Sequence, residues 1–293
     1  MCGISGIISL RSDLNDSDYS TVKRMSDSIS HRGPDQQKIQ RFDKIILANN
    51  RLKIMDLNDR SSLPMSSDDN SIWICYNGEV SNFLELKKKY KLSEKYNFKG
   101  TSDTEVMIYL YKELGISFIN KLSGMFAFCL WDTKQEKGIL VRDRQGIKPC
   151  YLSFFKDGSF AFASEIKSLL TLDGFQIEID DISLNLLHSF NYCLPPRTCY
   201  KNIYHLMPGT YIEFDRKGFQ KEYKYWQWPL SKEKKDIDLN KLNEILDESI
   251  KLQMRFDVKG CLFLSGGVDS SLVAAHLSKQ WDREKILAFS LNS

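Results

Sequence analysis

The sequence predicts an α+β domain built from packed sheets, followed by the opening of a parallel α/β sheet. Up to residue 215, short runs rich in Ile, Val, Phe, Tyr and Trp are broken by Gly, Asp and Asn, a pattern typical of β-strands. A few amphipathic helices lie between these runs, so the first domain combines sheet layers with helix layers. After residue 238 the order helix, strand, helix, strand is typical of a βαβ arrangement.

The elements of the first domain follow from their apolar patterns. The predicted strands are IISL, IILAN, IWICYN, MFAFCLWD, GILVRD, YLSFF, FAFAS and YIEFD. Helices are predicted where apolar residues recur every three or four positions. These positions are Val22, Met25 and Ile29, then Phe83 and Leu86, then Val106, Leu110 and Leu114.

A charged segment separates this domain from the next. Residues 216–238 lose the apolar alternation and gain charge, which indicates a connection. An apolar stripe from Leu239 to Ile250 then predicts a helix, and it is followed by the strand CLFLS, a helix from about Asp269 to Lys279 and the strand ILAFSL. We therefore expect a first domain over 2–215, a connection over 216–238 and a second domain over 239–293.

Length and composition limit the partners. The chain has 293 residues, 42% of them hydrophobic and 27% charged, and 41 basic against 38 acidic side chains give a net charge of +3. This balance does not suggest a nucleic acid or membrane partner. No apolar stretch approaches the ~18 residues of a membrane-spanning helix, and the N-terminus lacks the pattern of a signal peptide. We expect a cytoplasmic protein.

The seven cysteines are odd in number, widely spread and never arranged as C-x-x-C. Their spacing is not the one that is usual for zinc ligands or for the disulfide framework of a secreted protein. Most of these cysteines lie in apolar runs such as WICYN, MFAFCLW and CLFLS, where a buried and inert thiol is expected.

Cys2 differs because of its position directly after Met1. Removal of the methionine would leave a thiol and a free α-amine on one residue. An α-amine has a pKa of about 7.7 to 8.0, so part of it is neutral at pH 7 and can accept the thiol proton. Cys2 is thus a candidate nucleophile that carries its own base, although an arbitrary residue at position 2 is the alternative.

Four further segments contain polar residues at turns or helix starts. HRGPDQQ (31–37) is a turn, NNRLKIMD (49–56) places Arg51 at the end of a strand, YNGEV (76–80) ends a strand, and GTSDTE (100–105) begins a helix. Each also has a local explanation, because Asn-Gly is a common turn dipeptide, Ser-Asp is a plausible cap and Arg51 could form a surface ion pair.

Together, and in this order behind Met-Cys-Gly-Ile, these segments resemble the N-terminal glutaminase domain of the asparagine synthase (glutamine-hydrolysing) family. The resemblance continues through LSGMFAFCLWD, VRDRQGIKPCY, FASEIKSLL and LPPRTCYKNIYHLMPGTYIEFD. It implies a class II glutamine amidotransferase domain with the αββα sandwich of N-terminal-nucleophile (Ntn) hydrolases. It further implies that the second domain is an incomplete α/β adenine-nucleotide hydrolase-like domain of the ATP-pyrophosphatase type.

The resemblance also implies roles for individual residues. Cys2 would attack the side-chain amide of glutamine, while Asn77 and the backbone N–H of Gly78 hold the oxyanion. Arg51 would bind the α-carboxylate of glutamine through its planar fork, and Asp103 with Glu79 its α-ammonium. Leu52 and Ile54 complete the implied glutamine-binding set.

A second motif, LSGGVDSS (264–271), lies between a predicted strand and a predicted helix. Its glycines allow backbone N–H groups to approach an anion at the positive end of the helix, and a pyrophosphate is a natural ligand. A Ser-Gly-Gly turn capped by Asp269 is the alternative. The resemblance to the family's ATP loop implies ATP contacts with Leu264, Ser265, Gly266, Gly267, Asp269, Ser270 and Leu291, and a Mg²⁺ contact with Asp269.

The expected function is that of a ligase, a glutamine-hydrolysing asparagine synthetase that uses ATP and Mg²⁺ to amidate aspartate through aspartyl-AMP. Residues 239–293 are too few for a whole nucleotide-binding sheet, so a chain with glutaminase activity only is one alternative. Ser81, Gln145 and Cys150 depart from the family's usual residues, which makes another carboxylate acceptor, such as a surface-polysaccharide sugar acid, a second alternative. A homodimer is a candidate assembly.

Overall fold

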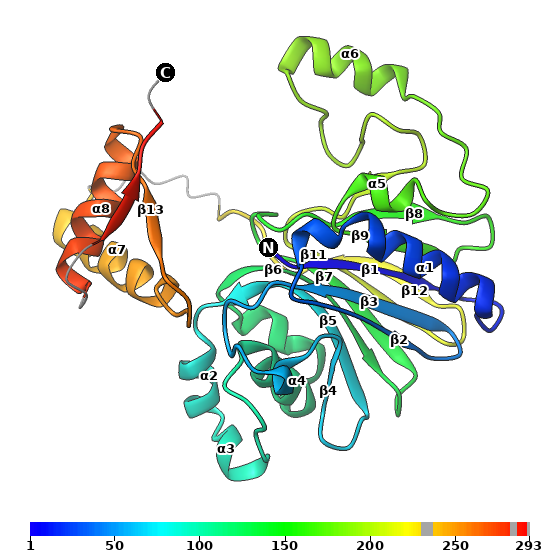
Figure 1. Ribbon diagram of the computed structural model, residues 1–293, viewed down its shortest axis with the longest axis horizontal. Helices are drawn as coiled ribbons and strands as arrows, with labels where there is room; N and C mark the ends of the chain where they lie inside the picture. The colour runs from blue at the N-terminus through cyan, green and yellow to red at the C-terminus, as the bar shows by residue number, and fades with distance from the viewer. Residues whose placement is uncertain (230–236, 282–285, 292–293) are drawn as a thin grey trace. The chain divides into compact units, whose positions relative to one another are not determined.

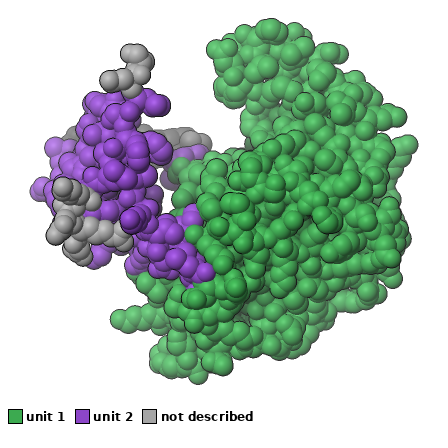
Figure 2. Space-filling model, viewed as in Figure 1, with its two compact units in different colours: residues 1–53, 58–227 green, residues 54–57, 228–293 purple. Residues whose placement is uncertain are grey.

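The computed structural model describes residues 1–229, 237–281 and 286–291. The chain divides into two compact units, shown in different colours in Figure 2. The first unit contains residues 1–53 and 58–227, and the second contains residues 54–57 and 228–293. Each unit is described by itself below.

Two six-stranded antiparallel sheets form the centre of the first unit. The first sheet has the order β10-β8-β9-β1-β3-β2. Its strands are β1 (Gly3–Ile8), β2 (Gln36–Arg41), β3 (Ile45–Arg51), β8 (Tyr151–Phe154), β9 (Phe160–Ala163) and β10 (Tyr204–His205). In its middle, β1 pairs with β3 so that Gly3 lies opposite Asn50, which places the N-terminus beside the end of β3.

The second sheet has the order β12-β11-β7-β6-β5-β4. Its strands are β4 (Met65–Ser66), β5 (Ile72–Val80), β6 (Gly124–Asp132), β7 (Lys137–Arg142), β11 (Thr210–Asp215) and β12 (Gln220–Lys224). Strand β12 lies within residues 216–238, which the sequence analysis interpreted as a connection and in which it predicted no strand. This edge strand is mostly polar, so it lacks the apolar alternation of a core strand, and it is held by pairing with β11 and by stacking of Tyr223 on Tyr211.

Helices cover the outer faces of both sheets, as Figure 1 shows. The helices of the unit are α1 (Asp16–Ser28), α2 (Phe83–Lys89), α3 (Leu92–Lys95), α4 (Asp103–Leu114), α5 (Ile166–Leu169) and α6 (Asp181–Phe190), and the 3-10 turns are η1 (Ser30–Arg32), η2 (Asp59–Ser61) and η3 (Gly115–Lys121). Helix α1 begins at an Asn15 capping box and buries Val22 and Met25 against the first sheet. Helix α4 lies on the second sheet, which completes an αββα sandwich.

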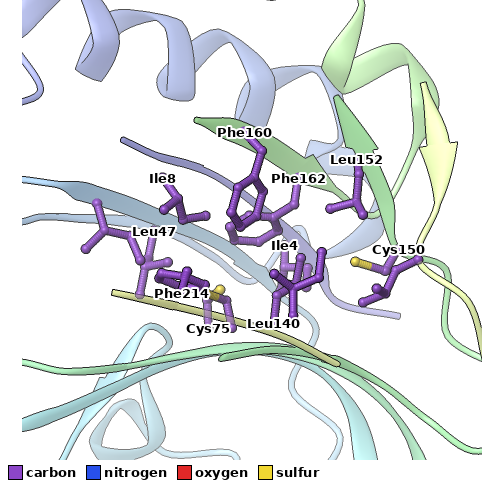
Figure 3. Packing of buried hydrophobic residues seen from close by; sticks show 14 of the residues in the cluster. Ile4, Ile8, Leu47, Cys75, Leu140, Cys150, Leu152, Phe160, Phe162 and Phe214 are labelled. Atoms are coloured by element: carbon purple, nitrogen blue, oxygen red, sulfur yellow. The ribbon is translucent and has the colours of Figure 1, made fainter. Parts of the chain in front are cut away.

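The core of the first unit lies between the two sheets (Figure 3). Alternate residues of a strand point to the same face, so each strand contributes every second side chain to this layer. The layer contains Ile4 and Ile8 from β1, Leu47 from β3, Cys75 from β5 and Phe160 from β9, all at most 1% exposed. The same alternation decides which side chains continue the layer at the strand ends.

The second unit contains α7 (Leu239–Gln253), β13 (Cys261–Phe263), α8 (Val268–Gln280) and β14 (Leu287–Phe289). Strands β13 and β14 are parallel and are joined through α8, which gives the predicted βαβ order. Several apolar side chains of the unit, including Phe263 and Phe289, are exposed among the described residues. The helices that the structure describes include none long and apolar enough to cross a membrane.

Candidate active site

The polar residues singled out by the sequence continue the layer between the sheets. By strand alternation, Cys2 shares its side of the first sheet with Ile4, and Arg51 shares its side with Leu47. In the second sheet Asn77 follows Cys75 at the same spacing. The apolar core is therefore replaced by a cluster of reactive and charged side chains where β3 and β5 end.

A buried asparagine joins the two sheets at this point. The Asn49 side-chain amide donates to the carbonyl oxygen of Gly3 at 3.2 Å and accepts from the backbone N–H of Tyr76 at 2.7 Å. Asn49 is fully buried. Because Gly3 follows Cys2 and Tyr76 precedes Asn77, this side chain links the backbone of the candidate nucleophile to that of the candidate oxyanion residue. The sequence analysis included Asn49 in a motif and assigned it no role.

Backbone contacts hold Cys2 from two sides. Its sulfur lies 3.3 Å from the backbone nitrogen of Leu52, which donates to it, and its carbonyl oxygen accepts from Nε of Arg32 at 3.0 Å. Arg32 also pairs with Glu165 at 3.0 Å. The HRGPD segment thus has a structural function at the site, and Arg32 is a positioning residue that sequence reasoning missed.

The buried Cys2 thiol needs a base to remove its proton. Burial raises the pKa of Cys2, and the Leu52 N–H, the N-terminal ammonium and Arg51 only partly offset this effect. At neutral pH the thiol is therefore protonated. Burial also lowers the pKa of the N-terminal ammonium, which is carried by Met1 here, so a neutral amine is more populated than it would be in water.

Asn77 has an unusual hydrogen-bonding state. Its side chain is 1% exposed, and neither the amide nitrogen nor the amide oxygen has a partner among the described residues. An unpaired buried amide costs free energy, and it is available to a ligand atom that enters the site. The next residue, Gly78, lies opposite Phe126, and a Cβ atom there would come within 2.3 Å of the Met125 carbonyl oxygen. A side chain larger than that of glycine does not fit at this position.

Two charged groups of opposite sign flank the cluster. Arg51 is 4% exposed and donates to the Asn58 carbonyl oxygen at 3.1 Å. Asp103 begins α4, and its Oδ2 atom accepts from the Tyr76 hydroxyl at 2.6 Å and from the Val80 N–H at 2.8 Å. Burial raises the pKa of Asp103, while these hydrogen bonds oppose the shift.

Glu79 and Lys148 form a second charged group near the thiol. Burial raises the pKa of Glu79, and the positive charge of Lys148 opposes this shift. Lys148 is only 6% exposed, and burial lowers its pKa while the charges of Glu79 and Cys2 act in the other direction. The sequence analysis quoted Lys148 only within a motif, because nothing in the local pattern indicates that this lysine is buried.

The remaining members of the predicted glutamine-binding set are placed differently. Leu52 directly follows β3 and contacts Cys2 through its backbone. Ile54 belongs to the second compact unit, where its carbonyl oxygen accepts from the Asp257 N–H at 2.9 Å. The structure therefore brings Cys2, Arg51, Leu52, Asn77, Gly78, Glu79 and Asp103 into one unit and groups Ile54 with the other.

The SGG motif forms a turn between β13 and α8 in the second unit. Gly266 has φ of 79°, a left-handed conformation that glycine adopts without strain, and the space around it is open. Gly267 caps α8, and the hydroxyls of Ser265 and Ser270 lie 3.0 Å apart across the turn. An anion at this helix start would meet free backbone N–H groups and two hydroxyls.

The other predicted ATP contacts lie around this turn. The Leu264 N–H donates to the Phe289 carbonyl oxygen of β14, which ties the turn to the next strand. Leu291 is 98% exposed just beyond that strand. Asp269 lies in the first turn of α8, and no group of three His, Cys, Asp or Glu side chains in the described part of the chain could hold a metal ion. Asp269 alone does not form a metal site, since Mg²⁺ is usually held by one or two carboxylates together with substrate phosphates.

Two family models match different parts of the chain. Residues 1–226 match the family described as "Glutamine amidotransferase domain", and residues 241–293 match the family "Asparagine synthase". An asparagine synthetase 2 (glutamine-hydrolyzing) of Bacillus subtilis is 34% identical over 96% of this chain, and asparagine synthetase B of Escherichia coli is 30% identical over 95%. The amidase chyE of Penicillium rubens is 34% identical over 94%. The chain spans 39%, 45% and 42% of these three relatives, respectively.

Solved structures resemble the chain in fold. An allosteric regulatory enzyme of purine biosynthesis aligns with a TM-score of 0.56 and 16% identity over 99% of this chain and 65% of its own. The glutamine phosphoribosylpyrophosphate amidotransferase of B. subtilis aligns with a TM-score of 0.53 and 16% identity, with the same coverage. The fold of the Ntn class II glutamine amidotransferases, predicted from the sequence, is confirmed.

Proposed function

Because the chain belongs to the glutamine amidotransferase family over residues 1–226 and matches the asparagine synthase family over residues 241–293, we propose that its first unit hydrolyses glutamine at Cys2. The ammonia released there would serve an ATP-dependent amidation in the complete protein. The division into 2–215, 216–238 and 239–293 is part of this proposal, and the cytoplasmic location and the homodimer stay predictions.

The first step requires removal of Met1. The neutral α-amine of Cys2 then takes the thiol proton, and the sulfur attacks the side-chain carbonyl carbon of glutamine. The tetrahedral intermediate collapses to a γ-glutamyl thioester, and the amide nitrogen leaves as ammonia after it receives the proton. Water attacks the thioester next, releases glutamate and restores the thiol. The high pKa of Cys2 supports a role for the amine, since the thiol does not ionise by itself at neutral pH.

The unpartnered Asn77 side chain is the observation that carries this proposal. A protein gains nothing in stability from a buried amide without a hydrogen bond. The amide N–H is suited to donate to the negatively charged oxygen of the intermediate, together with the backbone N–H of Gly78. A donor that is already in place and dehydrated stabilises the transition state without reorganisation.

The substrate's zwitterionic end matches the two buried charges. We assign the glutamine α-carboxylate to Arg51, whose guanidinium can donate two parallel hydrogen bonds. We assign the α-ammonium to Asp103, with Glu79 as the second acidic group. Leu52 and Ile54 are assigned to glutamine contacts as part of the same proposal.

For the second unit we propose ATP as a substrate that binds with its phosphates at Ser265, Gly266, Gly267 and Ser270. Its adenine and ribose are assigned to Leu264 and Leu291. Mg²⁺ would arrive on the phosphates of ATP, and Asp269 would lie near it. Aspartate is the proposed acceptor, activated as aspartyl-AMP. Another carboxylate is the second candidate, because a relative of equal identity is named as an amidase rather than as an asparagine synthetase.

Product analysis tests these assignments separately. The protein is incubated with glutamine alone, and then with glutamine, ATP, Mg²⁺ and either aspartate or another carboxylate such as a sugar acid. Glutamate, AMP and asparagine are measured individually. We expect glutamate with glutamine alone and none from Cys2→Ala. Full glutamate release by Cys2→Ala would overturn the glutaminase assignment. AMP formed only with a carboxylate other than aspartate would support the second candidate acceptor.

A further inference from the structure

Two cysteines outside the candidate active site lie in direct contact. The sulfur atoms of Cys193 and Cys199 are 2.8 Å apart, less than about 1 Å beyond the ~2.05 Å of a disulfide bond. Both thiols are free, and both residues are partly exposed. We propose that Cys193 and Cys199 form an oxidisable dithiol that becomes an intramolecular disulfide on exchange with a small-molecule disulfide such as oxidised glutathione.

The other cysteines lack this combination of contact and access. Cys75, Cys129 and Cys150 are fully buried in the core between the sheets, and burial raises their pKa values, so they are inert to exchange. Cys261 is exposed in the second unit. The expectation of buried thiols in the apolar runs is confirmed for Cys75 and Cys129 and is wrong for Cys261, because β13 leaves that side chain exposed.

Hydrogen bonds outside the pair hold the two cysteines in place. Cys199 is tied to the start of α6, because its carbonyl oxygen accepts from the Asp180 N–H at 2.9 Å. The neighbouring Arg197 pairs with the Asp180 carboxylate at 2.6 Å. Cys193 follows the end of α6, and its sulfur lies 4.0 Å from the Ser183 carbonyl oxygen. Closing the bond therefore requires little backbone movement.

A disulfide would secure a segment that apolar packing holds weakly. Among the residues of α6 only Ser183 is buried, while Ile182, Leu184 and Phe190 are each at least 40% exposed. Figure 1 shows α6 extending away from the sheets of its own unit. Since this segment contributes little to the core, a covalent link at its base would restrict its opening more than it would restrict a packed helix.

The exchange balances without any group from the active site. One cysteine thiolate attacks a sulfur of oxidised glutathione, which forms a mixed disulfide and releases one glutathione thiolate. The second cysteine thiolate attacks the protein sulfur of that bond, which forms Cys193–Cys199 and releases the second glutathione. The two cysteines lose two protons and two electrons, and one glutathione disulfide becomes two thiols. Burial and the contact with Cys199 raise the pKa of Cys193, so long incubation at mildly alkaline pH is appropriate.

The chain contains a convenient reporter for the bond. Trypsin cleaves after Arg197, between the two cysteines, so residues 168–197 and 198–201 remain joined only if the disulfide is present. The whole protein is incubated with oxidised glutathione, its free thiols are alkylated, and intact mass and unreduced tryptic peptides are measured. We expect the joined peptide pair and no alkylation of Cys193 or Cys199, whereas the exposed Cys261 retains a glutathione of its own.

Single variants separate a pair from two independent thiols. Cys193→Ser and Cys199→Ser should instead retain one bound glutathione, because the second attack is impossible. Cys261→Ser, which removes an exposed cysteine elsewhere, should form the joined peptides as the unmodified protein does.

Chymotrypsin cleavage after Phe190 and Tyr192 should slow several-fold on oxidation of the unmodified protein and not of Cys193→Ser. Separate glutathione adducts on both cysteines, or full alkylation of both after incubation, would overturn the proposal. This result does not depend on glutaminase activity.

Discussion

The hydroxyl of Tyr76 donates a 2.6 Å hydrogen bond to Oδ2 of Asp103 and so joins β5 to the first turn of α4. The same oxygen accepts from the Val80 N–H at 2.8 Å. The other oxygen, Oδ1, lies 3.4 Å from the Thr104 hydroxyl, and a hydrogen bond from the Thr104 backbone also lowers the pKa of the carboxyl group. Oδ2 therefore carries the two short hydrogen bonds from the fold, and we expect the proposed substrate ammonium to bind at Oδ1.

Replacing Tyr76 with phenylalanine tests this division. We expect Tyr76→Phe to raise KM for glutamine by about 10-fold with a smaller effect on kcat, because loss of a hydrogen bond to a charged group costs roughly 1.5 to 3 kcal/mol. Hydrolysis of 4-carbamoylbutanoate, which is glutamine without its α-amine, should change little. An equal loss for both substrates would point to a general distortion of the site instead.

We expect Asn77→Ala to lower the activity of the protein without lowering its stability. We expect kcat for glutamine hydrolysis to fall ~100 to 1,000-fold, as in other losses of one oxyanion donor. The melting temperature should stay the same or rise, since the native amide has no partner to lose. Glutamate release and thermal unfolding measure the two effects.

Asn82 provides the matched control for Asn77. Its side chain donates to the Lys121 carbonyl oxygen and accepts from the Ser123 N–H, both at 2.9 Å. Asn82→Ala should therefore lower the melting temperature and leave kcat unchanged. If Asn77→Ala were the less stable variant of the two and retained its activity, the oxyanion assignment would be wrong.

Asn49→Ala should weaken both the fold and the activity. It leaves the buried Tyr76 N–H without an acceptor, which costs about 1 to 3 kcal/mol of unfolding free energy. It also frees the Gly3 backbone beside Cys2, so kcat should decrease. Chemical denaturation and glutamate release test this. Asn49→Asp keeps the acceptor and should recover more stability than activity; unchanged stability in Asn49→Ala would contradict the linking role.

Burial of His205 should make the free energy of unfolding decrease in acid. Burial lowers its pKa to about 4, from about 6.5 in an unfolded chain. Above pH 6.5 the imidazole is neutral in both states, so its contribution is fully present. Between pH 6.5 and 4 the unfolded chain binds a proton that the folded protein does not, so stability falls as the pH falls. Below pH 4 this contribution to the slope ends.

The slope should disappear in His205→Phe, which keeps an aromatic ring against Tyr151, 4.6 Å away between ring centroids. Denaturation curves measured from pH 4 to 8 give the free energy of unfolding for both proteins. The exposed His188, changed to Gln, serves as the control and should keep the slope of the unmodified protein. Parallel profiles for His205→Phe and the unmodified protein would rule out this origin of the acid sensitivity.

Local sequence patterns predicted most of the helices and strands because the spacing of apolar residues decides which face of an element can be buried. The apolar spacing of Val22 and Met25 produces the amphipathic face of α1, and a strand run such as MFAFCLWD becomes β6 in the core. The sequence analysis missed β12 because its residues are mostly polar and lack the apolar alternation of a core strand. Its place at the edge of the second sheet depends on pairing with β11.

The sequence by itself determined the fold class, and it singled out Cys2, Arg51, Asn77 and Asp103 as candidate site residues because they lie in motifs that a single chain can reveal. Only the tertiary structure decided how these groups are supported. The Asn49 link between the sheets, the hold of Arg32 on Cys2, the burial of Lys148 and the contact of Cys193 with Cys199 all join residues that no local pattern relates. Their properties arise from burial and from partners on other elements, and these exist only once the chain has folded.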